Sequence, residues 1–277
     1  EMYLYCGTDR NNLTMQSRIG HDSDWPSYNH ANFYDLQPDT KYWFVAEATD
    51  SYGTRRSDTV AFYTYGTFID DRDSTEYKSI IIGNQTWMAE NLRYEGNVPL
   101  GQTASSTNPY LYYPEGNVEV LGYLYNWPAA INGENSSKMN PSGVQGICPN
   151  GWHLPSDAEW KELNKELGSG LFDDAGAQMA GNEGVLVRSW ESGKLNNSYY
   201  FGTSGFNALP AGGIYGTSDS SDEEASFWST TETNLSTPNG MANAVANYGI
   251  AYFSTSLDIT WALKEVGSSV RCIRGTT

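Results

Sequence analysis

Short runs of apolar and aromatic residues, separated by turn-forming residues, occupy the first part of the chain. Such runs are typical of β-strands. Strands are expected over residues 2–7, 32–36, 42–49 and 59–65. The third run carries large apolar residues on both faces, as the central strand of a sheet does. The pattern predicts a small β domain over residues 1–66.

A second hydrophobic pattern begins near residue 78. Residues 78–82 and 85–92 each have the pattern of a strand, and Gly83-Asn84 between them suits a turn with positive φ. This arrangement predicts a β-hairpin. Further short aromatic runs separated by Gly, Asn, Ser and Thr follow, and they indicate strands and loops more than helices.

One segment has the pattern of a helix. Ser156 and Glu159 have the spacing of a capping box, in which each side chain bonds the other residue's backbone N–H. The residues that follow place an apolar stripe on one helix face, and Gly168 ends the pattern. The stripe consists of Trp160, Leu163 and Leu167.

The length of 277 residues suits one small and one large domain, because domains usually run to roughly 100–200 residues. The patterns predict a domain over residues 1–66, a charged linker over 67–77 and a domain over 78–277. Asp70, Asp71 and Asp73 in this linker could form a calcium loop. A solvated connector is the favoured interpretation, since the regular acidic spacing of an EF-hand is absent.

The charge balance narrows the classes of partner. The chain has 33 acidic and 16 basic residues, a net charge of -17, and such a surface repels the phosphates of nucleic acids. No run of about 18 apolar residues is present, so no membrane-spanning helix is expected. An export signal or a lipid anchor would have been removed, or would lie outside these residues.

The cysteines lack the C-x-x-C spacing of a structural zinc site or a redox motif. Cys148 and Cys272 fall in the same predicted domain, each in a strand-like context, so we predict a disulfide between them, with Cys6 left unpaired. The alternative is that all three are small buried hydrophobic residues.

The turn at residues 36–42 resembles the corner of fibronectin type III domains. There a tyrosine hydroxyl, here that of Tyr42, hydrogen-bonds back to the preceding loop. The resemblance implies an immunoglobulin-like β-sandwich that is incomplete, because the opening strands of such a domain are missing. Those strands could lie upstream, have been cleaved, or be supplied by another chain, and something is expected to cover the open edge.

Six segments of the larger domain share an order typical of one family: residues 78–92, 122–127, 148–160, 205–213, 227–232 and 269–274. Taken together, they resemble the Fibrobacter succinogenes major paralogous family. The resemblance implies an exported protein of Fibrobacter or Bacteroidetes type, often an outer-membrane lipoprotein, with a C-type-lectin-like fold. Residues 149–160 and 270–274 are also similar to parts of formylglycine-generating-enzyme-like domains, which share that architecture. The expected fold class is therefore mainly β, an incomplete immunoglobulin-like sandwich followed by an α+β domain of C-type-lectin-like fold.

Catalysis is not expected. The formylglycine-type oxidase needs two reactive cysteines near the end of the domain, and only Cys272 lies in that part of this chain. His153 is the larger domain's one candidate base, and its strand context suggests packing. The calcium-binding triplets of sugar-binding C-type lectins are absent, so no metal or other cofactor is assigned. A pair of carboxylates suited to glycoside hydrolysis stays open as an alternative.

Loops over residues 185–200 and 214–226 are rich in Gly, Ser and Asn and carry aromatic residues. Recognition usually resides in loops on a rigid scaffold, and an aromatic plate can stack on a sugar or anchor a protein. The candidate contact residues are Trp190, Tyr199, Tyr200 and Tyr215, although packing beneath the loops would equally explain each one. The acidic run at 219–224 is interpreted as a solvated loop, with calcium binding as the alternative. Trp87, Trp127, Trp152, Trp160 and Trp228 are expected in the core.

These observations favour a non-catalytic binding protein at the outer-membrane surface or outside the cell. It would recognise extracellular glycan or serve as an accessory subunit of an outer-membrane nutrient-uptake complex. A structural or adhesive subunit of a pilus or surface stalk is the first alternative, motivated by the incomplete sandwich. A carboxylate-based enzyme is the second.

Overall fold

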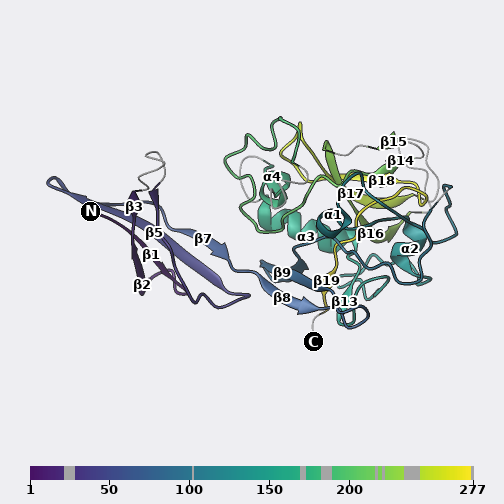
Figure 1. The fold of residues 1–277 in the computed structure, drawn as a ribbon, viewed down its shortest axis with the longest axis horizontal. Helices are drawn as coiled ribbons and strands as arrows, with labels where there is room; N and C mark the ends of the chain where they lie inside the picture. Colours follow the sequence, from purple (N-terminus) through teal and green to yellow (C-terminus); the bar gives the residue numbers. More distant parts are fainter. Residues whose placement is uncertain are drawn as a thin grey trace. The chain divides into compact units, whose positions relative to one another are not determined.

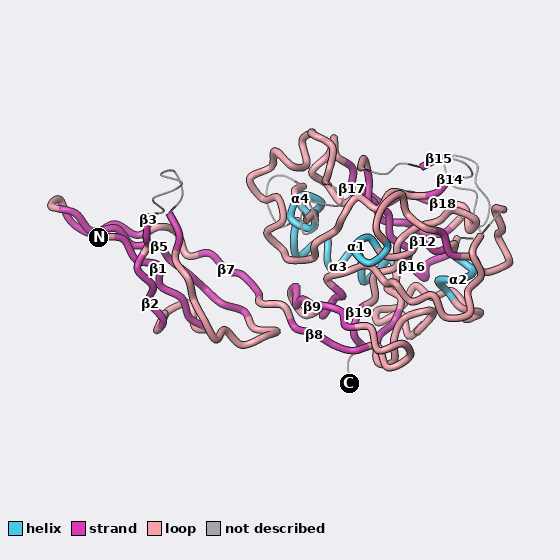
Figure 2. The backbone as a smooth tube through the Cα atoms, viewed as in Figure 1, coloured by secondary structure: helices cyan, strands magenta, loops and turns pink. Residues whose placement is uncertain are grey.

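The computed structural model shows a mainly β protein with several antiparallel sheets and few short helices (Figures 1 and 2), as the sequence predicts. The chain divides into two units, residues 1–66 and 67–277. No helix of the described residues is long and apolar enough to cross a membrane. The residues described are 1–21, 29–101, 103–168, 173–181, 189–215, 218–219, 222–233 and 244–275.

The first unit is built on one five-stranded sheet of order β2-β1-β5-β6, in which β7 also pairs with β5. The long strand β5 is its centre, because β1 pairs along one side and β6 and β7 share the other. A two-stranded sheet joins β3 and β4. The strands are β1 (Met2–Gly7), β2 (Met15–Arg18), β3 (Gly20–His21), β4 (Asn29–His30), β5 (Lys41–Asp50), β6 (Gly53–Arg56) and β7 (Val60–Tyr63).

The strand expected over residues 32–36 does not form. Asp35 has a φ of 61°, which is outside the strand region, and the segment leads into the turn before β5. The backbone N–H of Gln37 donates to the hydroxyl of Tyr42 at 3.0 Å, the bond that the turn sequence led us to expect. The Tyr42 ring stacks on Phe62, with centroids 5.7 Å apart.

The second unit has a five-stranded sheet of order β13-β19-β10-β9-β8 and a three-stranded sheet of order β16-β17-β18. The predicted hairpin is confirmed as β9 and β10, joined at Gly83 with a φ of 60°. The strands of the two sheets are β8 (Gly66–Ile69), β9 (Glu76–Ile82), β10 (Gln85–Met88), β13 (Trp152–His153), β16 (Glu224–Glu232), β17 (Val245–Ala251), β18 (Asp258–Ala262) and β19 (Ile273–Arg274). The remaining pairs are β11 (Leu111–Tyr112) with β12 (Leu124–Tyr125), and β14 (Ile214–Tyr215) with β15 (Ser218–Asp219).

Residues 67–77 differ from the solvated linker that the sequence favoured, because they contain most of β8 and the start of β9. The carboxylate of Asp70 is fully buried, and Arg72 donates to both of its oxygens at 2.9 and 2.7 Å. From the sequence alone, the charged residues of this segment look like a hydrophilic stretch in solvent. Their pairing with each other allows the segment to join the folded unit.

The predicted helix is confirmed as α3 (Asp157–Leu167), and both hydrogen bonds of the Ser156–Glu159 capping box are present. Trp160 and Leu163 on its apolar stripe are buried. In the part of the chain that the structure describes, three shorter helices accompany it: α1 (Val118–Leu121), α2 (Trp127–Ile131) and α4 (Ala175–Met179).

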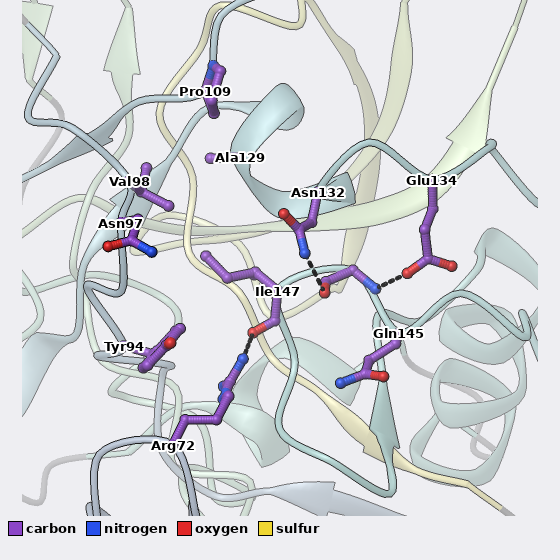
Figure 3. Close-up of a pocket in the computed structure, with 11 residues that line it drawn as sticks. Arg72, Tyr94, Asn97, Val98, Pro109, Ala129, Asn132, Glu134, Gln145 and Ile147 are labelled. Atoms are coloured by element: carbon purple, nitrogen blue, oxygen red, sulfur yellow. Dashed lines mark hydrogen bonds between the residues drawn. The ribbon is translucent and has the colours of Figure 1, made fainter.

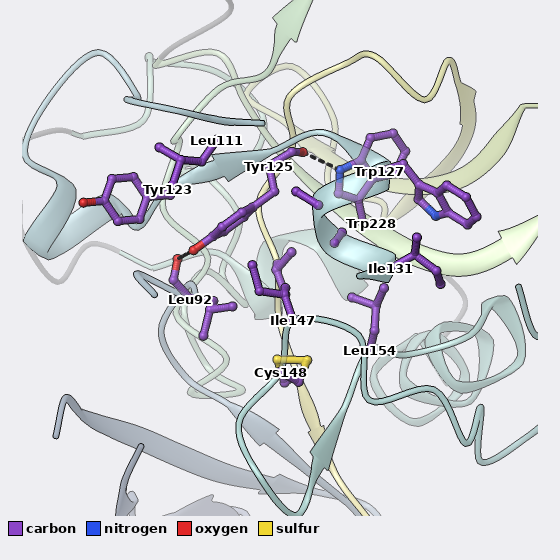
Figure 4. Packing of buried hydrophobic residues seen from close by; sticks show 14 of the residues in the cluster. Leu92, Leu111, Tyr123, Tyr125, Trp127, Ile131, Ile147, Cys148, Leu154 and Trp228 are labelled. Carbon is purple, nitrogen blue, oxygen red and sulfur yellow. Dashed lines mark hydrogen bonds between the residues drawn. A yellow bond between two sulfur atoms is a disulfide. The ribbon is translucent and has the colours of Figure 1, made fainter. Parts of the chain in front are cut away.

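The core of the second unit confirms two further predictions. A disulfide joins Cys148 to Cys272 across 5.9 Å between Cα atoms, and Cys6 is a free, buried thiol in the first unit. Figure 4 shows the disulfide at one side of the main hydrophobic cluster. Burial of an indole requires a partner for its N–H, and Trp228 donates to the carbonyl of Tyr125 at 2.6 Å. The tryptophans predicted to be core are all buried: Trp87, Trp127, Trp152, Trp160 and Trp228.

Candidate functional site

The contact residues predicted from the sequence differ in how much of each side chain is exposed to solvent. Tyr199 is 91% exposed and Tyr200 is 46% exposed, with their rings edge to face at 5.4 Å between centroids. Trp190 is only 5% exposed, so the prediction of a surface role for it is wrong. An indole with so little accessible area cannot offer its face to a ligand. The side chain of Tyr215, in β14, lies outside the described residues.

Backbone hydrogen bonds hold the loop of Tyr199 and Tyr200 against helix α4 and the segment after β17. The N–H of Gly202 donates to Ala177 O at 2.9 Å, and the N–H of Ala177 donates to Thr255 O at 2.9 Å. The N–H of Leu195 donates to Tyr252 O at 3.0 Å. These bonds place the two loops beside each other on a fixed support, as recognition loops require.

Two glycines make this close approach possible. A Cβ on Gly193 would lie 2.2 Å from Tyr252 O, and a Cβ on Gly176 would lie 2.1 Å from Ser256 O. Neither contact is sterically tolerable for a residue with a side chain. Glycine at each of these two positions therefore lets one backbone lie directly against another.

Phe253 is a further exposed aromatic residue, on the second of these loops, that was not identified from the sequence. It is 61% exposed, and its ring packs edge to face against Tyr252 at 5.3 Å between centroids. It lies just after β17, next to the loop of Tyr199 through the Leu195–Tyr252 bond. We call Tyr199, Tyr200 and Phe253 the aromatic loop surface. Only the pairing of the two loops reveals it, because some 50 residues separate their sequences.

Two side-chain amides are held in the loop that precedes Tyr199. The Oδ1 of Asn196 accepts from the N–H of Gly193 at 3.0 Å, and the Nδ2 of Asn197 donates to Gly193 O at 2.7 Å. These bonds fix both amides within a few residues of Tyr199. Side-chain amides donate and accept hydrogen bonds, and aromatic faces pack against C–H groups. This combination suits a ligand with hydroxyl groups and apolar ring faces, as sugars have.

The candidate calcium carboxylates do not form a common site. Asp70 is paired with Arg72, Asp71 accepts from the side-chain amide of Asn150 at 3.1 and 3.0 Å, and Asp73 accepts from the backbone N–H of Thr75 at 2.9 Å. Within the described residues, no group of three or more His, Cys, Asp or Glu side chains could hold a metal ion. The acidic run at 219–224 lies partly outside those residues.

His153 is buried against a carboxylate. Its Nε2 lies 2.6 Å from Oε1 of Glu159, and Oε2 of Glu159 accepts the backbone N–H groups of Ser142 and Ser156 at 3.1 and 2.9 Å. All four residues are buried. The imidazole thus joins β13 to the start of α3, which matches the packing role that its strand context suggested.

Comparison with known proteins gives one match. The model of the Fibrobacter succinogenes major domain matches residues 80–274. The matched range runs from β9 to β19, and so covers nearly all of the second unit. No curated protein and no solved structure was found to match.

Proposed function

This chain belongs to the Fibrobacter succinogenes major domain family, and from that premise we propose that it is a non-catalytic, exported protein that binds extracellular glycan. The observation that carries the proposal is the aromatic loop surface. Apolar groups that lie together on an exposed surface often mark a site of interaction. Here they stand on loops that hydrogen bonds fix before any ligand arrives, which lowers the entropy lost on binding.

Binding is favoured over catalysis by the position of His153. A general base must reach the proton that it abstracts, whereas His153 is enclosed in the interior and bonded to Glu159. The carboxylate-based enzyme stays as the weaker alternative. Activity on a glycoside that is lost on mutation of paired carboxylates would establish it.

Export is supported by the disulfide, because such bonds persist in oxidising compartments. We place the protein at the outer-membrane surface or outside the cell. In one version of this role, the protein is an accessory subunit of an outer-membrane nutrient-uptake complex and passes the bound glycan to a partner protein. Co-purification with an outer-membrane complex from a native membrane would support that form.

We also propose a specific fold for each of the two units. The sheet order β2-β1-β5-β6 and the Gln37–Tyr42 hydrogen bond support a partial fibronectin type III domain in the first unit, since a tyrosine corner of this kind occurs in immunoglobulin-like sandwiches. The disulfide next to the last strand and a helix begun by a capping box support a C-type-lectin-like fold in the second.

Replacing Tyr199 and Tyr200 together with alanine should weaken glycan binding by about tenfold or more, because each exposed aromatic anchor contributes about 1 kcal/mol or more. A glycan array with the wild-type chain selects the ligand, and calorimetry measures the dissociation constants. Tyr52→Ala is the matched control, since Tyr52 is 92% exposed in the first unit. Equal affinities for all three proteins, or no binding on the array, would remove the basis for this function.

A structural or adhesive role is the second candidate, and one face of the first unit favours it. Met2 and Leu4 on β1, Phe44 on β5, and Val60 and Phe62 on β7 share that face by their register, and none of them is fully buried. An apolar sheet face of this kind suits a second copy of the chain.

Under this second role the protein should self-associate at high concentration, and Val60→Lys should reduce the association by placing a charge on the shared face. Light scattering over a concentration series measures the effect. Tyr52→Lys, in the exposed turn after β5, adds the same charge away from the face and should leave the association unchanged. A wild-type chain that stays monomeric throughout the series rules the role out.

A further inference from the structure

Two neighbouring pockets of the second unit, far in sequence from the aromatic loop surface, share Pro109 and Asn132 in their walls. The first has a volume of about 450 Å³ and the second about 420 Å³, each within the range of about 300–1,000 Å³ typical of small-molecule sites. We call the two together the Pro109 groove.

Side-chain amides line the first pocket. Figure 3 shows Asn97 on one side, facing Asn132 and Gln145 on the other. The Nδ2 of Asn132 donates to Gly146 O at 3.3 Å, and the N–H of Gly146 donates to Oε1 of Glu134 at 2.8 Å. Asn132 also caps α2, in the left-handed conformation. Several of these polar groups are therefore held in place before a ligand binds.

Among the described residues that line this pocket, Arg72 is the one cation, and Asp70 neutralises it. Arg72 bonds both oxygens of Asp70, donates to Ile147 O at 2.9 Å, and stacks on the ring of Tyr94 at 3.8 Å. Burial lowers the pKa of Arg72, but its hydrogen bond and Coulombic attraction to Asp70 outweigh this effect and raise the pKa. The guanidinium stays charged and paired, so it supports the Tyr94 ring and leaves an anionic ligand little net attraction.

The second pocket is more apolar. Trp127, Pro128 and Ile131 line it, with hydroxyl groups from Ser106 and Thr107 at its edge. Amides at one end and apolar groups with hydroxyls at the other match a neutral molecule that carries both hydroxyls and C–H faces. A protein of net charge -17 also disfavours acidic ligands.

We propose that the Pro109 groove binds a short neutral oligosaccharide, with one sugar ring among the amides of Asn97, Asn132 and Gln145 and the next against Pro109 and Ile131. The proposal goes beyond glycan recognition at the aromatic loop surface, because the two sites share no residue. It assigns the chain a second carbohydrate site, separate from the aromatic loop surface.

The test uses the full chain and a panel of neutral di- to tetrasaccharides of glucose, xylose, mannose and galactose. The double variant Asn97→Ala with Gln145→Ala should bind the selected saccharide about tenfold or more weakly than wild type, since each lost hydrogen bond costs about 0.5–1.5 kcal/mol. Asn135→Ala is the control, because Asn135 is exposed next to Glu134 but lines neither pocket. The Asn135→Ala protein should melt as the wild type does. The double variant should melt slightly lower, because the Nε2 of Gln145 donates to Cys148 O at 3.1 Å and to Asn150 Oδ1 at 3.3 Å.

Chemical-shift changes in ¹H–¹³C correlation spectra of the protein locate the contacts, which should fall on Val98, Pro109 and Ile131. Loss of the aromatic loop surface through Tyr199→Ala and Tyr200→Ala should leave this binding unchanged, so the failure of either site can be told from the failure of the other. No binding by any saccharide of the panel, equal affinities for the double variant and wild type, or capture of peptides in place of saccharides would overturn the proposal.

Discussion

Replacing Arg271 with methionine should lower the free energy of unfolding of the second unit by about 3–5 kcal/mol. Arg271 is 1% exposed. Its Nε donates to Asn91 Oδ1 at 2.7 Å, its Nη1 to Met88 O and Phe206 O at 2.9 and 2.6 Å, and its Nη2 to Asn207 O at 2.9 Å. Methionine fills similar space but leaves these buried oxygens without their donor.

Urea denaturation followed by tryptophan fluorescence measures this loss. Arg271→Lys should recover only part of it, because one ammonium group cannot reproduce the planar fork of the guanidinium. Arg274→Met is the matched control. Arg274 is half-buried and stacks on Trp152 at 4.8 Å, so its loss should cost about 1 kcal/mol or less. An Arg271→Met protein as stable as the wild type would contradict the interpretation of Arg271 as the central donor of this region.

Removal of the Cys148–Cys272 disulfide, by replacing both cysteines with alanine, should cost about 2–5 kcal/mol of stability. The bond closes a loop with a sequence separation of 124 residues, and long loops lose the most chain entropy when they are closed in the unfolded state. For a unit of this size the melting temperature should fall by roughly 4–20 °C.

Reductant supplies the control for the disulfide. Dithiothreitol should lower the melting temperature of the wild type toward that of the double alanine variant, and should not change the melting temperature of the variant itself. Cys6→Ala should respond to reductant as the wild type does, since Cys6 forms no disulfide. If the melting temperature of the wild type is the same before and after full reduction of the disulfide, the bond adds no stability.

Local patterns predicted the features whose causes are local. Gly83 and Asn84 mark the turn of a hairpin because few residues accept positive φ, and Ser156 with Glu159 begins α3 because both halves of a capping box lie within one turn. The buried tryptophans follow from apolar runs that only a core can accommodate. The disulfide between Cys148 and Cys272 could be predicted because both cysteines fall in the same predicted domain. The order of the sequence motifs indicated the family, which the match over residues 80–274 establishes.

Only the tertiary structure decided which polar and aromatic residues face solvent. Trp190 and Tyr199 stand in similar loop sequences, yet one is buried and the other exposed, because exposure depends on what the rest of the chain places above each ring. Asp70 is buried because Arg72 neutralises it, a pairing that charge counts do not reveal. The aromatic loop surface and the Pro109 groove each join segments distant in sequence, and such proximity arises from packing, which the periodicity of a single strand or helix does not encode.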